Sequence, residues 1–305
     1  MTKTMLPPIA IHGNKFTFEI APVLLAAQRF YPGEAQVKLG GIANLFGIEG
    51  IPGFSEAGEA DVATHAETQG LRYSVANPDL RIILTVAQGL YRLVGRRSSG
   101  IESVADLKGK RIATIPNTSS GYFLNRLLAS AGLDDLDVEI VRILPLNNMV
   151  NALANGEVDA VTIWEPYMED AARAIGTDGI EFGGKGIYRE LFNLNTSAAN
   201  LADPQKRTKI VAFVRAVMDA AAEIRVNPSA GWPLVHASGG HPMEVIEQAW
   251  PHHAYTAEMA PDLLDVMELE EQWLAAMDDR TPRNRTALAT LIDSTVAEEA
   301  RRAPA

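Results

Sequence analysis

Short apolar runs alternate with amphipathic helical patterns over the first two thirds of the chain. Runs such as Pro8–His12, Arg81–Val86 and Lys110–Ile115 have the length and residue types of buried strands. Between such runs, apolar residues recur every three or four positions, as in Leu124–Ala131, which predicts a helix that ends at Gly132. Because regular alternation of strands and helices is typical of α/β proteins, we predict an α/β fold.

The same patterns place the other elements. Further strands are predicted at Asp61–Thr64, Leu90–Gly95, Val138–Ile143 and Val158–Ile163, and further helices at Ile20–Ala27, Asn147–Ala154 and from Pro166 onward. From residue 39 to residue 57 the pattern is weak, and we expect a strand and a loop there. From Asp203-Pro204 to about Arg301 the pattern is nearly all helical. We therefore predict two α/β lobes and a helical tail that packs on them.

Two stretches of the chain repeat one pattern without a gap. Residues 57–67 and 155–165 share Gly, Glu, Asp, Thr and Glu at the same offsets. A helix that ends on glycine, a surface turn and a short buried strand would produce this pattern once in each lobe. Ligands of open α/β sheets lie beyond the carboxyl ends of strands, so the residues after both strands are candidates for a cleft between the lobes. These candidates are Thr64, His65, Glu67, Trp164 and Glu165. The alternative is an ordinary helix-to-strand turn that recurs by chance.

Composition narrows the classes of function. The chain has 305 residues, of which 47% are hydrophobic and 21% charged, the balance of a globular protein with a buried core. No apolar run approaches the ~18 residues needed to span a bilayer. The net charge of −11 argues against nucleic acid or an anionic membrane as the main partner, because both bind clustered Lys and Arg. The absence of cysteine excludes thiol nucleophiles, disulfides, thiolate zinc sites and iron–sulfur clusters.

The first residues bear on the cellular compartment. Residues 1–8 contain one lysine, Lys3, and no apolar stretch of the length that a secretory signal needs. We expect a cytoplasmic protein if the chain begins here, and a periplasmic one if a signal segment has been removed.

One segment of the chain resembles a known family. Residues 100–113, Gly-Ile-Glu-Ser-Val-Ala-Asp-Leu-Lys-Gly-Lys-Arg-Ile-Ala, resemble the opening of the second lobe in nitrate/sulfonate/taurine-type solute-binding proteins. Asn155–Ala160 and Trp164–Tyr167 are similar to the later signature of this family. The resemblance covers about residues 55–200 and implies a type II periplasmic-binding fold. It implies a first lobe of residues 1–92 plus 193–305 and a second lobe of residues 93–192, with chain crossings near 89–97 and 191–198.

The resemblance also implies where a ligand binds. Its family contacts ligand after the first strand. Independently of the resemblance, the start of the helix at Thr118–Ser120 is a natural anion site, because free N–H groups and the helix dipole favour an anion there. The same residue types serve as ordinary helix caps and turn residues, and Tyr122 as a core residue. The candidates outside the repeat are His12, Asn14, Lys15, Thr118, Ser119, Ser120, Tyr122, Asn193 and Asn195.

The remaining polar clusters in the sequence do not indicate a metal site or a catalytic site. The spacing of the tail histidines fits no helical metal-ligand pair, so we expect surface or packing histidines, no metal and no cofactor. These histidines are His236, His241, His252 and His253. Thr118–Ser120 lacks the Gly-x-Ser-x-Gly pattern of serine hydrolases. The acidic run Glu268–Glu271 is predicted to be a solvated helix face.

Two functions follow from these expectations. The first is a monomeric receptor that closes on a small organic ligand and delivers it to an ABC importer. The ligand would be a sulfonate, a carboxylate, or an aromatic or heterocyclic anion or zwitterion. The alternative is a cytoplasmic enzyme of the same fold, with His12 or His65 as a general base near Glu67. The resembling family includes thiamin-pyrimidine synthases and aromatic sulfinate desulfinases, but their chemistry depends on cysteines that this chain lacks. A cytoplasmic sensor without catalysis is a third possibility.

Overall fold

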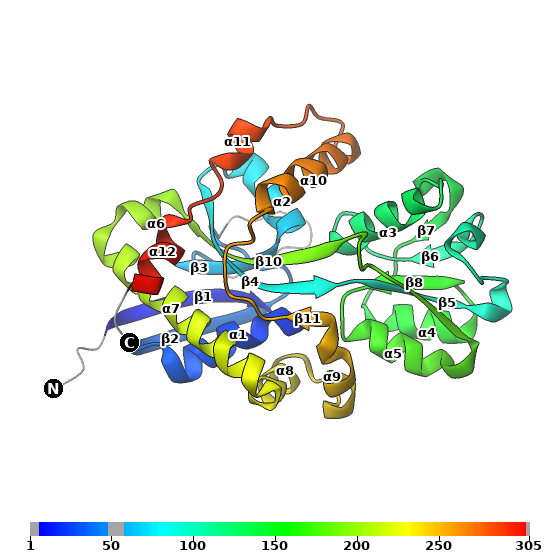
Figure 1. The fold of residues 1–305 in the computed structure, drawn as a ribbon, viewed down its shortest axis with the longest axis horizontal. Helices are drawn as coiled ribbons and strands as arrows, with labels where there is room; N and C mark the ends of the chain where they lie inside the picture. Colours follow the sequence, from blue (N-terminus) through cyan, green and yellow to red (C-terminus); the bar gives the residue numbers. More distant parts are fainter. Residues whose placement is uncertain (1–5, 48–57, 303–305) are drawn as a thin grey trace. The chain divides into compact units, whose positions relative to one another are not determined.

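The computed structural model describes residues 6–47 and 58–302, and these form two compact units (Figure 1). Unit 1 comprises the described residues up to Gln88, together with Leu191–Met243 and the chain from His253 onward. Unit 2 comprises Gly89–Glu190 and Glu244–His252. We propose that the units correspond to the two predicted lobes. The sequence assigned Glu244–His252 to the first lobe, whereas these residues group with unit 2.

Unit 1 is built on a six-stranded sheet in the order β11-β4-β10-β3-β1-β2. The strands are β1 (Leu6–Asn14), β2 (Gly33–Gly40), β3 (Val62–Ala66), β4 (Leu80–Leu90), β10 (Arg189–Ser197) and β11 (His253–Ala254). Strand β1 runs parallel to β2 and β3, whereas β10 runs antiparallel to β3. The carboxyl ends of β1 and β3 therefore lie at the same edge of the sheet, near the polar residues His12 and Asn14 of β1 and Thr64 and His65 of β3.

Helices cover both faces of this sheet (Figure 1). One face carries α1 (Ala21–Leu25), α7 (Pro204–Val226), α8 (Trp232–Gly239) and α12 (Thr295–Arg302). The other carries α2 (Glu67–Ala76), α10 (Leu263–Met277) and α11 (Arg285–Ala289), and α6 (Ala198–Ala202) leads into α7. The predicted start of the long helix is confirmed: Pro204 is its first residue, and the Asp203 carboxylate accepts hydrogen bonds from the amides of Gln205 and Lys206.

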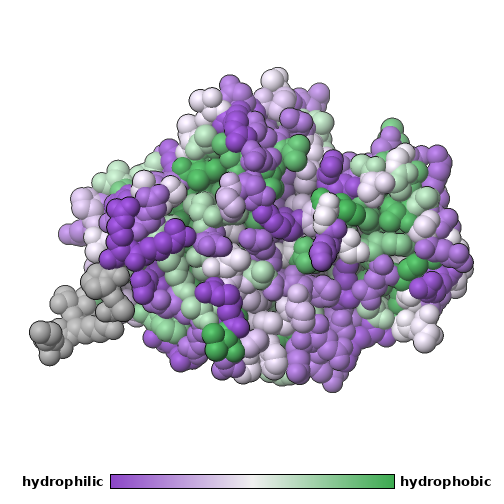
Figure 2. Space-filling view, viewed as in Figure 1, coloured by the Kyte–Doolittle hydropathy of each residue, from purple (hydrophilic) through white to green (hydrophobic). Residues whose placement is uncertain are grey.

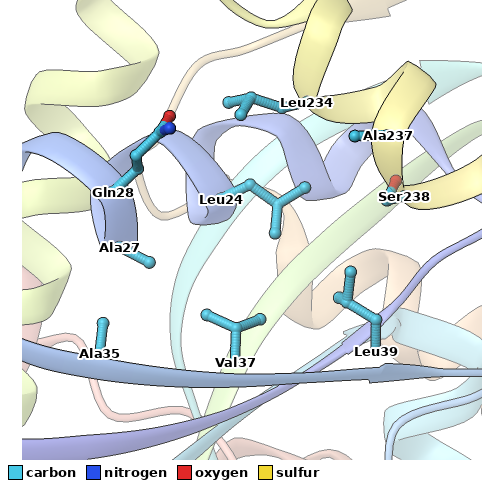
Figure 3. A pocket seen from close by; sticks show the side chains of 9 residues that line it. All are labelled: Leu24, Ala27, Gln28, Ala35, Val37, Leu39, Leu234, Ala237 and Ser238. Atoms are coloured by element: carbon cyan, nitrogen blue, oxygen red, sulfur yellow. The ribbon is translucent and has the colours of Figure 1, made fainter.

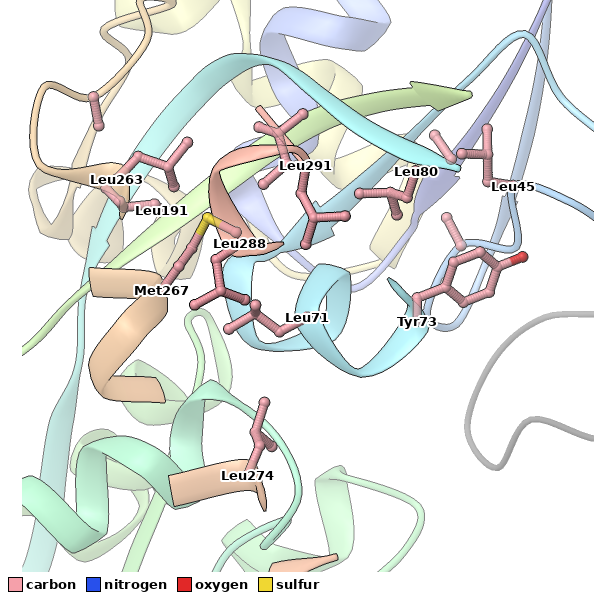
Figure 4. Close-up of a cluster of buried hydrophobic side chains, with 14 of the residues drawn as sticks. Leu45, Leu71, Tyr73, Leu80, Leu191, Leu263, Met267, Leu274, Leu288 and Leu291 are labelled. Atoms are coloured by element: carbon pink, nitrogen blue, oxygen red, sulfur yellow. The ribbon is translucent and has the colours of Figure 1, made fainter. Parts of the chain in front are cut away.

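The helical tail is part of the core of unit 1. Leucines from α2, β4, β10 and α11 meet Met267 of α10 in one buried cluster (Figure 4). Leu71, Leu80 and Leu191 are each almost completely buried, and burying a leucine stabilises a protein by about 1.5–3 kcal/mol. Because strands and tail share these contacts, the predicted packing of the tail is confirmed for α10 and α11.

The acidic run on α10 is not a solvated face, and that prediction was wrong. Glu270 and Glu271 are fully buried. The Glu271 carboxylate accepts hydrogen bonds from the guanidinium groups of Arg280 and Arg283, and Arg283 also donates to Ser74 Oγ of α2 at 2.9 Å. The helical pattern predicted that the run is exposed to solvent. It could not show the partners Arg280 and Arg283, because they follow the end of the helix.

The contact of Glu271 with Arg280 and Arg283 is expected to weaken in acid. Burial alone raises the pKa of Glu271, but the hydrogen bonds from Arg283 and Arg280 outweigh burial and lower the pKa to about 2. Between pH 4.5 and pH 2 the unfolded state therefore binds more protons at this group, and stability falls as the pH falls. We expect Glu271→Gln to be less stable than wild type at pH 7 and to lose less stability between pH 4.5 and pH 2. Urea unfolding across this pH range measures both effects.

The matched control is Glu268→Gln, on the same helix but in contact with solvent and Arg285. It should keep the wild-type dependence on pH. An unchanged slope in Glu271→Gln would show that Glu271 does not couple folding to protons.

Unit 2 is built on a five-stranded sheet in the order β7-β6-β8-β5-β9. The strands are β5 (Arg92–Arg96), β6 (Arg111–Ala113), β7 (Glu139–Val141), β8 (Ala160–Ile163) and β9 (Gly179–Gly183). The helix α3 (Ser119–Ser130) covers one face, and α4 (Asn147–Asn155) and α5 (Tyr167–Ile175) pack together on the other (Figure 1). Helix α9 (Met243–Ala249) groups with unit 2 from Glu244 onward. Gly132 follows α3 with a positive φ of 74°, as the sequence predicted.

The α/β class and most elements are confirmed, but strands β2, β9 and β10 were missed. Of these, β2 shows a strand period in the sequence. Ala35, Val37 and Leu39 are half-buried, and the polar residues between them are exposed, which is the period of an edge strand. This alternation is visible in the sequence and could have predicted the strand. The part of the weak segment from residue 48 to residue 57 lies outside the described residues.

In the described part of the chain, no helix is both long and apolar enough to cross a membrane. On the visible face, hydrophilic side chains are interspersed with small apolar patches (Figure 2).

Candidate functional site

The repeated sequence pattern occupies equivalent places in the two sheets. Strand β3 lies between a parallel β1 and an antiparallel β10, and β8 lies between a parallel β6 and an antiparallel β5. Asp61 accepts a hydrogen bond from the Ala10 amide at 2.8 Å and donates its own amide to the Ala10 carbonyl. Asp159 makes the same two bonds with Arg111. The aspartate thus clamps the neighbouring parallel strand in each unit, and the repeat is structural rather than accidental.

At the carboxyl end of β1, His12 holds the loop after β2. Its Nδ1 lies 2.6 Å from the carbonyl oxygen of Asn44, so Nδ1 carries the proton. The Asn44 side chain accepts a hydrogen bond from Tyr73 Oη at 2.6 Å and one from the Gly47 amide. Burial lowers the pKa of His12, so the imidazole is neutral near pH 7.

His65 at the end of β3 is held at both ring nitrogens. Its Nε2 donates to the Ala43 carbonyl at 2.6 Å, and Asn195 Nδ2 donates to its Nδ1 at 2.8 Å. Its ring stacks on Tyr73 with centroids 5.5 Å apart. Burial lowers the pKa of His65 to about 4. A general base needs an available lone pair and a pKa near the working pH, so this geometry argues against His65 in that role.

The other unit 1 candidates make mainly structural contacts. Asn14 accepts from the Phe16 amide, and the Lys15 ammonium lies 4.8 Å from the centre of the Phe16 ring. Glu67 accepts from the Leu191 amide at 2.9 Å, and Asn193 accepts from Thr85 Oγ at 2.8 Å. Two buried polar atoms, Thr64 Oγ1 and Asn195 Oδ1, have no hydrogen-bond partner within the described residues.

In unit 2, two of the three residues at the start of α3 stabilise the loop before it. Thr118 Oγ1 donates to the Ile115 carbonyl at 2.8 Å and pairs with Ser120 Oγ at 2.8 Å. Thr114 donates to the same Ser120 hydroxyl at 3.1 Å. These contacts are not helix capping, because the side chain of Thr118, the N-cap residue, accepts no hydrogen bond from the first turn. They tie the loop at Ile115 to the first turn of α3 instead.

Ser119 points elsewhere, toward Tyr91 and Glu190. Its hydroxyl lies 2.8 Å from Tyr91 Oη and donates to Glu190 Oε1 at 3.1 Å. All three residues are buried and belong to unit 2. Neither Tyr91 nor Glu190 was a candidate from sequence. Tyr91 is 28 residues and Glu190 71 residues from Ser119 along the chain, so no local pattern could have found them.

The ring of Tyr91 belongs to a cluster of aromatic side chains. The Tyr91 and Tyr188 ring centroids are 5.6 Å apart, and those of Tyr122 and Tyr188 are 5.3 Å apart in an edge-on arrangement. Phe123 lies 5.8 Å from Tyr91. The sequence allowed Tyr122 to be either a cleft residue or a core residue. In the structure it is 5% exposed and belongs to this aromatic cluster.

The two candidates after β8 differ in their surroundings. Trp164 is half-buried, and its buried indole Nε1 has no hydrogen-bond partner among the described residues. Glu165 accepts from Arg92 Nε at 2.7 Å and from the Glu169 amide at 3.0 Å. Arg92 also donates to Glu169 at 2.9 Å and to Glu181 at 2.7 Å. The Glu165 carboxylate is therefore engaged by the chain itself, whereas Trp164 offers a donor.

A separate groove lies in unit 1, and no sequence candidate is among its lining residues. It encloses about 370 Å³ between α1, β2 and α8 (Figure 3). Its lining is mostly aliphatic: Leu24, Ala27, Gln28, Ala35, Val37, Leu39, Leu234, Ala237 and Ser238. No charged group lines it, and its polar side chains are those of Gln28 and Ser238. No group of three or more potential metal ligands occurs in the described part of the chain.

Comparisons with known proteins agree with the resemblance read from the sequence. A family model described as "NMT1/THI5 like" matches residues 17–230. A protein of Escherichia coli (strain K12) named as an aliphatic sulfonates-binding protein is 30% identical over 180 residues, which cover 57% of this chain and 53% of that protein. A Haemophilus influenzae protein named for thiamine biosynthesis is 28% identical over 188 residues, covering 59% of this chain and 57% of that protein. This chain thus spans about half the length of the curated relatives it matches.

A solved structure shows the same fold. The alkanesulfonate-binding protein SsuA from Xanthomonas axonopodis pv. citri, bound to MOPS, has a TM-score of 0.70 and 19% identity. The match covers 95% of this chain and 99% of that one. The predicted periplasmic-binding-like fold is therefore confirmed.

Proposed function

The chain belongs to the NMT1/THI5-like family, and from this membership we propose that it binds a small organic ligand and delivers it to an ABC-type importer. The proposed ligand class is a sulfonate, a carboxylate, or an aromatic or heterocyclic anion or zwitterion. The sulfonate-binding names of its relatives support this class. The predicted cleft between the lobes stays a prediction.

The observation that carries the proposal is the polar end of the unit 2 sheet. The first turn of α3 has backbone N–H groups without helical partners, which favour the acceptor oxygens of an anion. The buried Trp164 Nε1 is a further donor without a protein partner among the described residues. An indole N–H can orient a ligand oxygen while the ring covers an aliphatic or aromatic part.

Binding without catalysis fits the histidines better than the enzyme alternative does. Both nitrogens of His65 are occupied, and Nδ1 of His12 is committed to Asn44. Each of these bonds fixes a ring that holds the loop after β2, so both histidines have a structural role. The enzyme alternative therefore depends on Nε2 of His12 as the general base. A His12→Gln variant tests this alternative.

A ligand screen tests the proposal. We expect at least one ligand among ethanesulfonate, taurine, benzoate, nitrate and 4-aminopyrimidine to raise the melting temperature and to bind in calorimetry without being consumed. At a hundredfold excess over Kd, such binding stabilises the fold by about 2.7 kcal/mol. Trp164→Phe should weaken binding about three- to tenfold, the cost of one lost hydrogen bond.

The matched control is Trp250→Phe, a buried tryptophan of unit 2 that follows helix α9 in the chain and not β8. It should bind as wild type does. Turnover of any of these compounds, or no stabilisation by a panel widened to other organic anions, would contradict the proposal.

A further inference from the structure

Strand β2 is the last strand of the unit 1 sheet, and within the described residues it pairs with β1 alone (Figure 1). Its other edge, the open edge, presents backbone groups to which a further strand can bind. The Lys15 amide donates to the Gly40 carbonyl at 3.0 Å, so the even-numbered residues of β2 direct their backbone groups toward β1. Because these groups alternate in direction along a strand, those of Ala35, Val37 and Leu39 point to the open edge.

The two faces of β2 differ in polarity. Its odd-numbered side chains line the aliphatic groove against α1 and α8 (Figure 3). Its even-numbered side chains, Glu34, Gln36 and Lys38, lie on the opposite face and are exposed. Gln36 Nε2 donates to Glu34 Oε1 at 2.9 Å. The exposed face of the strand therefore carries a negative, a neutral and a positive side chain in succession.

This order of charges is complementary to itself. If two copies of β2 pair antiparallel about a twofold axis at Gln36, Glu34 of each copy lies opposite Lys38 of the other. The same register places Ala35 opposite Val37, and the backbone groups of both residues point to the open edge. These two residues then exchange hydrogen bonds, whereas Glu34 and Lys38 occupy the positions where opposed side chains lie closest.

Other registers of β2 with itself lose one of these contacts. A shift by one residue opposes backbone groups that point outward to groups that point toward β1. A shift by two residues restores the hydrogen bonds but moves Glu34 away from Lys38 of the second copy. One register therefore satisfies the backbone and both charges together.

The same pairing brings apolar surface together. Val37, Leu39 and Leu234 line the groove and are half-buried in a single copy. The twofold axis lies perpendicular to the sheet, so the grooves of both copies lie on one face of the joined sheet, next to each other. No charged group lines either groove, so apolar surface can be covered there without the cost of burying a charge.

We infer that the open edge of β2 binds a second copy of this chain, so that the unit 1 sheets of two copies join into one sheet with twofold symmetry. This inference goes beyond the proposed function and does not depend on the ligand. It differs from the monomer expected from the sequence, where strand β2 was missed.

Sedimentation equilibrium of the full chain over a wide range of protein concentrations tests the inference. We expect a monomer–dimer equilibrium that weakens at high salt, because the charge pairs are exposed to solvent. Lys38→Glu should raise the Kd of the dimer about tenfold, since it turns two attractive cross-strand pairs into repulsive ones. Combining it with Glu34→Lys restores opposite charges and should return the Kd to near its wild-type value. The matched control is Lys185→Glu, an exposed lysine of unit 2 with the same change in net charge, and it should dimerise as wild type does.

A backbone variant tests the hydrogen bonds. Val37→Pro removes an N–H that points to the open edge and leaves the bonds to β1 in place, as proline does on edge strands. It should abolish the dimer, whereas Val37→Ile keeps the N–H and should dimerise. Far-ultraviolet circular dichroism checks that each variant is folded.

Three results would overturn the inference. The first is a wild-type chain that stays monomeric at every concentration, whichever other partner the groove accepts. The second is a dimer that survives in folded Val37→Pro. The third is a dimer that Lys38→Glu does not weaken or that the charge swap does not restore, and this result decides the matter if Val37→Pro does not fold.

Discussion

Replacing Arg92 by leucine should lower the free energy of unfolding of unit 2 by about 3–5 kcal/mol, the usual cost of leaving buried charges without their partner. Arg92 is 6% exposed and donates to three carboxylates, of which those of Glu165 and Glu169 are buried. Leucine fills part of the space but leaves these two charges without a counter-ion, and water cannot replace it fully. Urea unfolding, with hydrogen exchange followed in β5 and β8, measures the loss and locates it.

Two further variants separate charge from packing at this site. Arg92→Leu combined with Glu165→Gln and Glu169→Gln removes the uncompensated charges and should recover part of the lost stability. Arg173→Leu, a half-exposed arginine that contacts Glu169 at 3.5 Å, should cost far less than Arg92→Leu, because exposed ion pairs contribute little to stability. A loss from Arg92→Leu no larger than that from Arg173→Leu would contradict the role given to Arg92.

Replacing Gly121 by alanine should destabilise unit 2 by about 1–3 kcal/mol, the range for an overpacked site. A Cβ at this position would lie 2.0 Å from the carbonyl oxygen of Pro116 and 2.6 Å from its carbonyl carbon. Both are backbone atoms, so the loop before α3 or the first turn of α3 must move. Because Thr118 and Ser120 tie that loop to the helix, the movement also shifts Ser119. Thermal and urea unfolding measure the effect.

Gly70→Ala is the matched control. Gly70 also lies in a helix, α2, and a Cβ there meets no atom within 4 Å. Alanine lowers the entropy of the unfolded chain and favours helix, so this variant should be as stable as wild type or more stable by up to about 1 kcal/mol. Equal stability of Gly121→Ala and wild type would show that the loop adapts without cost.

Local patterns predicted those elements whose apolar period follows from burial of one face. The helix α3, its end at Gly132 and the start of α7 at Pro204 are of this kind. Strand β10 has no such period, because it is buried along both faces and its polar residues, such as Asn193 and Asn195, are buried too. Burial of polar residues in a strand depends on partners that lie elsewhere in the chain.

The candidate site divides in the same way. Ser119 could be named from sequence because a Ser/Thr-rich loop before a helix is a local feature. Its partner Glu190 is 71 residues away, and Arg92 is 73 residues from Glu165. Nothing in the neighbourhood of Glu190 or Arg92 distinguishes it from a surface residue.

By itself the sequence determined the α/β class, the order of most elements, the repeated strand end in each unit and the family. Each of these follows from the spacing of apolar residues along a helix or strand, or from a contiguous sequence motif. Only the tertiary structure decided what the polar residues do. It showed that His12, His65 and Glu165 are engaged by the chain itself, and that a carboxylate, Glu190, lies at the start of α3 where the sequence predicted an anion. The physical reason is that the partner of a buried polar group is set by which strands fold side by side, and the spacing of residues along the chain does not contain that information.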